Sequence, residues 1–128
     1  MKIRIVEAKL PQPQRKQLIR EFIKFCISEL GLKSPLNCKI TLTNDKSKTT
    51  SYAYFNPSNN NIVVYIGNRN VGDIMRSLSH EIYHFFQNQK NQLKPNSGST
   101  GSKEENSANA MSGIIMRKFG KLHPEIFE

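Results

Sequence analysis

Two histidines with three residues between them, and a glutamate directly after the first, form the motif His80-Glu81-x-x-His84. On a helix, residues four positions apart lie one turn above each other, so both imidazoles can reach one metal ion. Zinc accepts such nitrogens at about 2.0–2.1 Å in a roughly tetrahedral arrangement. Glu81 is not needed as a ligand, because it can stand beside a water on the metal and take its proton. The motif therefore predicts the ligands His80 and His84 and the general base Glu81 of a zinc peptidase.

A third ligand is expected, because a catalytic zinc usually takes three protein ligands and leaves a fourth position for water. The downstream candidates are Glu104, Glu105, His123 and Glu125. We favour Glu105, since Asn109 stands four residues later on the same helical face. There it can hydrogen-bond the second nitrogen of a ligand histidine.

The segment Ser102-Lys103-Glu104-Glu105 is also a capping box, in which Glu105 would only bond back to the start of a helix. Taken alone, the cap and the ligand are about equally good interpretations. With the metal motif present, the ligand is the stronger one, and Glu104 is the fallback. His123 lies far beyond His84 and lacks the short glycine-containing spacing of three-histidine sites.

The motif needs a helix, and the residues around it predict one. Asn70 is a good N-cap, and Asp73 follows three residues later, where it can face the helix dipole. The motif residues lie on the other side from the core stripe, because Leu78 and His80 are about 200° apart around the axis. The stripe keeps a three- and four-residue spacing: Val71, Ile74, Met75, Leu78, Ile82, Phe85 and Phe86.

The other patterns predict the elements that would position this helix. Residues 2–9, 38–43, 50–55 and 62–66 have the patterns of strands, the last two as a hairpin, while residues 14–30 and 103–119 have helical spacing. We therefore predict an α+β fold: a small twisted, mostly antiparallel sheet of about three or four strands, a backing helix, and then two metal-bearing helices. A chain of 128 residues is most simply one domain, residues 1–128.

Composition narrows the class of protein. No stretch approaches the roughly 20 apolar residues of a membrane helix, and residues 1–7 do not have the pattern of a signal peptide, so we expect a cytoplasmic protein without membrane contact. The net charge of +9 is spread from Lys2 to Lys121 with no run of four basic residues, which favours a generally basic surface over a nucleic-acid site. Cys26 and Cys38 are interpreted as reduced core thiols, with a single disulfide as the alternative.

The two motifs together resemble those of a known enzyme family. His80-Glu81-x-x-His84 followed by Glu105-x-x-Ala108-Asn109 is similar to the gluzincin zinc metallopeptidases, in particular the minimal single-domain gluzincins and the ImmA/IrrE family. Residues 98–119 and 123–127 also resemble uncharacterised metallopeptidase-like proteins of tailed bacteriophages. The motifs cover about the C-terminal half of the chain, and the N-terminal half matches only in the order of its elements.

The resemblance implies a zincin-like domain with Zn²⁺ as cofactor. For a phage-encoded protein it implies the host-cell cytoplasm, with the virion as the alternative. The second histidine is not followed by a third or by a methionine turn, which argues against the metzincins. Asn109 stands where many gluzincins carry an aspartate.

The expected reaction is hydrolysis of a peptide bond in a polypeptide substrate. An edge strand of the sheet would pair with the extended substrate, and the candidate, by its place before the metal helix, is Ile62, Val63, Val64, Tyr65 and Ile66. A group that stabilises the oxyanion is also expected. Four residues could supply it: Tyr54, Tyr65, Arg117 and His123.

Two other classes stay open. One is a DNA-associated protease of the SprT type, suggested by the basic charge, and the other is a non-catalytic zinc-binding phage protein. The endopeptidase could also be kept latent by residues 123–128 folding over the cleft. We expect a monomer, with nucleic acid as a partner not favoured.

Overall fold

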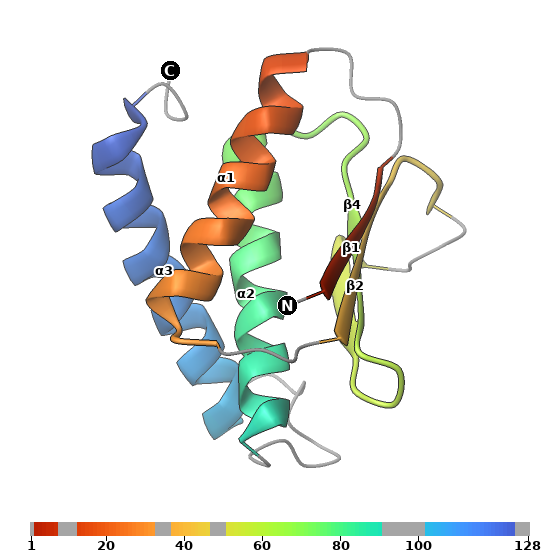
Figure 1. The fold of residues 1–128 in the computed structure, drawn as a ribbon, viewed down its shortest axis with the longest axis vertical. Coiled ribbons are helices and arrows are strands. Elements are labelled where there is room, and N and C mark those ends of the chain that lie inside the picture. Colours follow the sequence, from red (N-terminus) through yellow and green to blue (C-terminus); the bar gives the residue numbers. More distant parts are fainter. Residues whose placement is uncertain (1, 8–12, 33–36, 47–50, 91–101, 125–128) are drawn as a thin grey trace.

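The structure, a computed structural model, describes residues 2–7, 13–32, 37–46, 51–90 and 102–124 (Figure 1). It contains strands and helices in separate layers, with the three helices on one side of the sheet (Figure 1). The α+β class is as predicted. In chain order the elements are β1 (Lys2–Glu7), α1 (Pro13–Glu29), β2 (Asn37–Thr43), β3 (Ala53–Asn56), β4 (Asn61–Tyr65), α2 (Val71–Gln89) and α3 (Lys103–Leu122).

The sheet is mixed, and the prediction of a mostly antiparallel sheet is wrong. Its four strands have the order β1-β2-β4-β3, in which β1 pairs with β2 and β2 with β4 in parallel, and only β3 and β4 are antiparallel. The helix α1 connects β1 to β2 and carries the chain back to the end of the sheet where β1 began, so that β2 can run parallel to β1. Alternation of side chains predicts which face a residue takes but contains no information about strand direction.

The prediction that residues 62–66 form an edge strand is also wrong. β4 lies between β2 and β3, so its main chain is hydrogen-bonded on both sides. The hairpin places β3, not β4, at the edge. The side chains of Ile62, Val63 and Val64 are buried, and their apolar character on both faces reflects this interior position.

The core lies between the sheet and the helices. Alternate residues of β2 and β4 supply Ile40, Leu42, Ile62 and Val64, which pack with residues of α1, α2 and α3. Cys26 and Cys38 are buried and free, as expected. Burial raises the pKa of the Cys38 thiol to about 12 and that of Cys26 further, so both behave as small apolar side chains.

Both α2 and α3 begin at the capping residues that the sequence predicts. Asn70 caps α2, because its Oδ1 accepts a hydrogen bond of 2.9 Å from the backbone N–H of Asp73. Ser102 caps α3 by accepting from the backbone N–H of Glu105 at 3.1 Å. Among the described helices, none is long and apolar enough to cross a membrane.

Candidate metal centre

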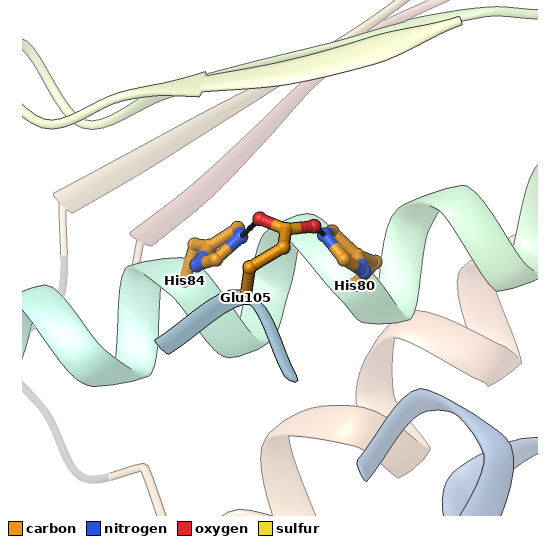
Figure 2. A group of neighbouring side chains, drawn as sticks. All are labelled: His80, His84 and Glu105. Atoms are coloured by element: carbon orange, nitrogen blue, oxygen red, sulfur yellow. Dashed lines mark hydrogen bonds and ion pairs between the residues drawn. The ribbon is translucent and has the colours of Figure 1, made fainter. Parts of the chain in front are cut away.

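Three predicted ligands meet where α2 crosses the first turn of α3. Glu105 Oε1 lies 2.6 Å from Nε2 of His80, and Glu105 Oε2 lies 3.1 Å from Nε2 of His84. Figure 2 shows the carboxylate between the two imidazole rings, whose centroids are 4.8 Å apart. Within the described part of the chain, these three residues are the group whose donor atoms could hold a metal ion.

The donor atoms fit zinc in kind and in spacing. One oxygen and two nitrogens within 4.8 Å of one another supply the mixed set of a catalytic zinc with a fourth position open. Donors at about 2.0–2.1 Å from a tetrahedral zinc are roughly 3.3 Å apart. Glu105 reaches the two histidines with different oxygens, at 2.6 and 3.1 Å, and the three donors lie within 4.8 Å of one another. Their separations therefore differ by at most about 1.5 Å from those that zinc would require.

The backbone and the side chain of Glu105 make separate contacts, and its side chain does not serve only the cap. Its backbone N–H donates to Ser102, which is the first half of a capping box. Its carboxylate instead contacts the two histidines. The backbone of one residue thus starts α3 while its side chain belongs to the cluster.

Close packing of the two helices brings Glu105 to the histidines. Ala108, one turn after Glu104, is fully buried. Further along, the hydroxyl oxygens of Ser79 and Ser112 lie 2.6 Å apart, and both are within hydrogen-bond distance of the carbonyl of Arg76. Small side chains and this buried polar contact allow α3 to lie directly against α2.

Asn109 makes the smallest contribution to the pKa of His80 and favours the protonated imidazole. Burial has the larger, opposite effect and lowers the pKa of His80 below its ordinary value; the Glu105 carboxylate raises it, and His84 lowers it. The outcome favours a neutral imidazole, which is the form that binds a metal.

Gln87 is a residue of this cluster that the sequence reasoning missed. Its Oε1 is 2.7 Å from Nδ1 of His84, and its Nε2 donates to the backbone carbonyl of Glu104 at 2.9 Å. Its side chain is 2% exposed. The available signal was the i, i+3 spacing from His84, which puts the two residues on neighbouring positions of one helical face.

Glu81 is buried beside the cluster, at 7% exposure. Burial, and secondarily the charge of Glu105, raise its carboxyl pKa from 4.5 to about 8. Phe85, one turn later on the same face, packs edge-on against Phe55 of β3 with ring centroids 6.0 Å apart. Glu81 therefore lies on the side of α2 that faces the edge strand of the sheet. The prediction that all three motif residues lie opposite the core stripe is wrong for Glu81, because at 100° per residue it is only about 40° from Phe85 around the axis.

The structure does not bring the four expected oxyanion residues to the cluster. Tyr54 follows the strand alternation and takes the sheet face opposite Phe55, away from α2. The Tyr65 hydroxyl lies against Gly67. Arg117 is exposed, and it and His123 follow Glu105 by 12 and 18 positions, or about 18 and 27 Å along α3 at 1.5 Å per residue.

His123 lies at the far end of α3, where it stacks on Phe119 and pairs with Glu21. Glu104 contributes its carbonyl to the Gln87 contact. The ligand candidate Glu125 lies outside the described residues, as do residues 125–128 of the tail 123–128 that was offered as a cover for the cleft.

Comparisons with protein-family models, with curated proteins and with solved structures found no match for this chain.

Proposed function

We propose that this protein is a zinc-dependent endopeptidase of the gluzincin type. The observation that carries the proposal is the convergence of two imidazole nitrogens from α2 with a carboxylate from α3, beside a buried glutamate. The gluzincin type is favoured because the third donor is a glutamate on the following helix. The ligands are His80, His84 and Glu105.

The reaction assigned to this site is hydrolysis of a peptide bond. Zinc, when bound, would supply a Lewis acid that activates water and polarises the scissile carbonyl. Glu81 accepts a proton from the attacking water and later donates it to the leaving nitrogen. A pKa near 8 suits Glu81 for the step in which it donates a proton. A cation bound nearby would favour the ionised carboxylate, which the proton-accepting step needs.

The edge strand β3 is the best place for the substrate. Among the described strands it pairs only with β4, on one side, and it contacts α2 through Phe55 and Phe85. An extended peptide that adds to this edge by main-chain hydrogen bonds would run past the face of α2 that carries Glu81. This assignment replaces residues 62–66, whose main chain is already paired on both sides.

The test measures zinc content and cleavage of an unstructured polypeptide, such as casein, in matched proteins. Glu81→Gln is expected to keep its zinc and lose roughly 10²- to 10⁴-fold in rate, the usual contribution of a general base. Glu21→Gln, which removes an acidic group at the other end of α3, is the control and should retain full activity.

The remaining outcomes separate the other classes. A wild type that holds one zinc but cleaves nothing would be a non-catalytic zinc-binding protein, and unchanged proteolysis in Glu81→Gln would reject the mechanism. Salt-dependent binding of DNA by an active protein would instead support the DNA-associated class, for which the charge of +9 is the motivation.

A further inference from the structure

Gln87 is an almost fully buried side chain with a hydrogen bond at each end of its amide. Burying an amide is costly unless its polar atoms are paired. Here both are: the oxygen contacts Nδ1 of His84 at 2.7 Å, and the nitrogen contacts the carbonyl of Glu104 at 2.9 Å. The glutamine therefore joins a ligand histidine on α2 to the backbone of the first turn of α3.

The orientation of this amide follows from its partners. A backbone carbonyl can only accept a hydrogen bond, so the NH₂ group of Gln87 must face Glu104. The amide oxygen must then face His84, and since it too can only accept, Nδ1 of the imidazole must carry a hydrogen. The nitrogen left with a lone pair in the neutral ring is Nε2, the atom that faces Glu105.

We propose that Gln87 is a positioning residue that selects Nε2 of His84 as the metal-binding nitrogen and ties α3 to it. The carbonyl that it holds belongs to Glu104, directly before Glu105 in the chain. One amide thus sets the tautomer of one ligand and the backbone position of another. The inference rests on the proposed zinc site and adds the residue that organises it.

The two histidines differ in this respect. The corresponding residue for His80 is Asn109, which has a small effect on the His80 pKa, is exposed and lies on α3. The partner of His84 is buried and lies on its own helix. A solvated partner can be replaced by water, whereas a buried one cannot, so the zinc site should depend more on Gln87 than on Asn109.

The experiment compares Gln87→Met with Gln89→Met, a substitution of an exposed glutamine on the same helix. Zinc affinity is measured by competition with a chelating dye, and imidazole tautomers by ¹⁵N NMR of the metal-free proteins at alkaline pH. The chain has three histidines, so variants of the other two assign the signals of His84.

We expect Gln87→Met to bind zinc about 10- to 100-fold more weakly, the usual effect of removing a partner of a metal ligand. The ¹⁵N shifts of His84 should change from the Nδ1–H form to a mixture of tautomers. A merely structural role for Gln87 would not change the tautomer. Gln89→Met should match the wild type in both measurements.

Gln87→Glu separates the two hydrogen bonds and serves if Gln87→Met does not fold. A carboxylate can still accept from Nδ1 of His84 but cannot donate to the carbonyl of Glu104. This variant should keep the wild-type tautomer while losing zinc affinity. Loss of the Nδ1–H form in Gln87→Glu would contradict the assigned orientation of the amide.

Two results would overturn the proposal: wild-type affinity and tautomer in Gln87→Met, or a wild type that binds no zinc. Neither measurement uses proteolysis, so a protein that lacks the proposed peptidase activity can be told apart from one in which Gln87 does not position the zinc site. In that case zinc binding would depend on Gln87 as described, and no peptide would be cleaved.

Discussion

The helix α3 brings a histidine and a glutamate together at each of its ends, but the two contacts are built differently. At the N-terminal end, Glu105 reaches both His80 and His84 at 2.6 and 3.1 Å. At the C-terminal end, His123 Nε2 lies 3.6 Å from Glu21 Oε2, and these side chains are 29% and 43% exposed. The His123 ring stacks on Phe119 with centroids 4.5 Å apart.

The difference shows what turns a histidine–glutamate contact into a candidate metal site. A single solvent-exposed pair contributes about 0–1 kcal/mol to the free energy of unfolding and does not need a bound cation to form. At the N-terminal end, one helix presents two imidazoles a turn apart, and the next helix supplies a carboxylate between them (Figure 2). Convergence of three donors, with a buried partner for one of them, distinguishes the first end from the second.

The largest expected effect is loss of zinc from one end only. Glu105→Ala removes one of three donors, so the variant should no longer hold one zinc per chain after gel filtration. This loss exceeds the about 10- to 100-fold decrease in zinc affinity expected when a hydrogen-bond partner of a ligand is removed. Glu21→Ala, the matched change at the other end, should retain one zinc per chain by atomic absorption. Equal zinc contents in the two variants would erase the distinction between the ends.

The second expected effect is a pH dependence caused by buried Glu81 in the metal-free protein. Below about pH 4.5 this carboxyl is protonated in both states; between there and about pH 8 only the unfolded chain loses the proton. The free energy of unfolding should therefore fall as the pH rises through this window, by at most about 1.4 kcal/mol per unit.

The measurement is urea unfolding of wild type and Glu81→Gln across that window, with the metal removed. The variant should lack the Glu81 contribution. The comparison is needed because His80, whose pKa is lowered mainly by burial, acts in the opposite direction and destabilises the fold as the pH falls. Identical slopes in the two proteins would show that Glu81 is charged in the folded state.

A third prediction concerns stabilisation by the metal. Zinc at 100 times its dissociation constant should stabilise the fold by about 2.7 kcal/mol, which corresponds to a rise in Tm on the order of 10 °C for a domain of this size. Differential scanning calorimetry should show the same rise in His123→Ala and none in His84→Ala. A rise in His84→Ala would place the zinc elsewhere.

The smallest expected effect belongs to the C-terminal end. His123→Ala removes the stacking on Phe119 and the contact with Glu21, and should cost about 1 kcal/mol of the free energy of unfolding. Chemical denaturation measures this cost, and zinc content should not change. A loss of zinc in this variant would connect the two ends of α3 and contradict their separation.

The local features of the site could be predicted from the sequence. The spacing of His80 and His84 places both on one helical face, and the cap residues Asn70 and Ser102 mark where α2 and α3 begin. Each of these relations spans a few residues, so helix geometry and nearby hydrogen bonds are enough to establish them. The choice of Glu105 also came from local spacing, through Asn109.

Only the tertiary structure decided how these pieces meet. Because β4 pairs with β2, β3 is left as the edge strand, and this pairing joins segments that are distant in the chain. The tertiary structure also places Gln87 against the carbonyl of Glu104, a contact between residues of two different helices. Such contacts arise from the packing of α3 on α2, whereas the motif His80-Glu81-x-x-His84 arises from a single turn of helix. For this reason the sequence alone predicts the two histidine ligands and their base, and only the fold supplies the edge strand and the buried glutamine beside them.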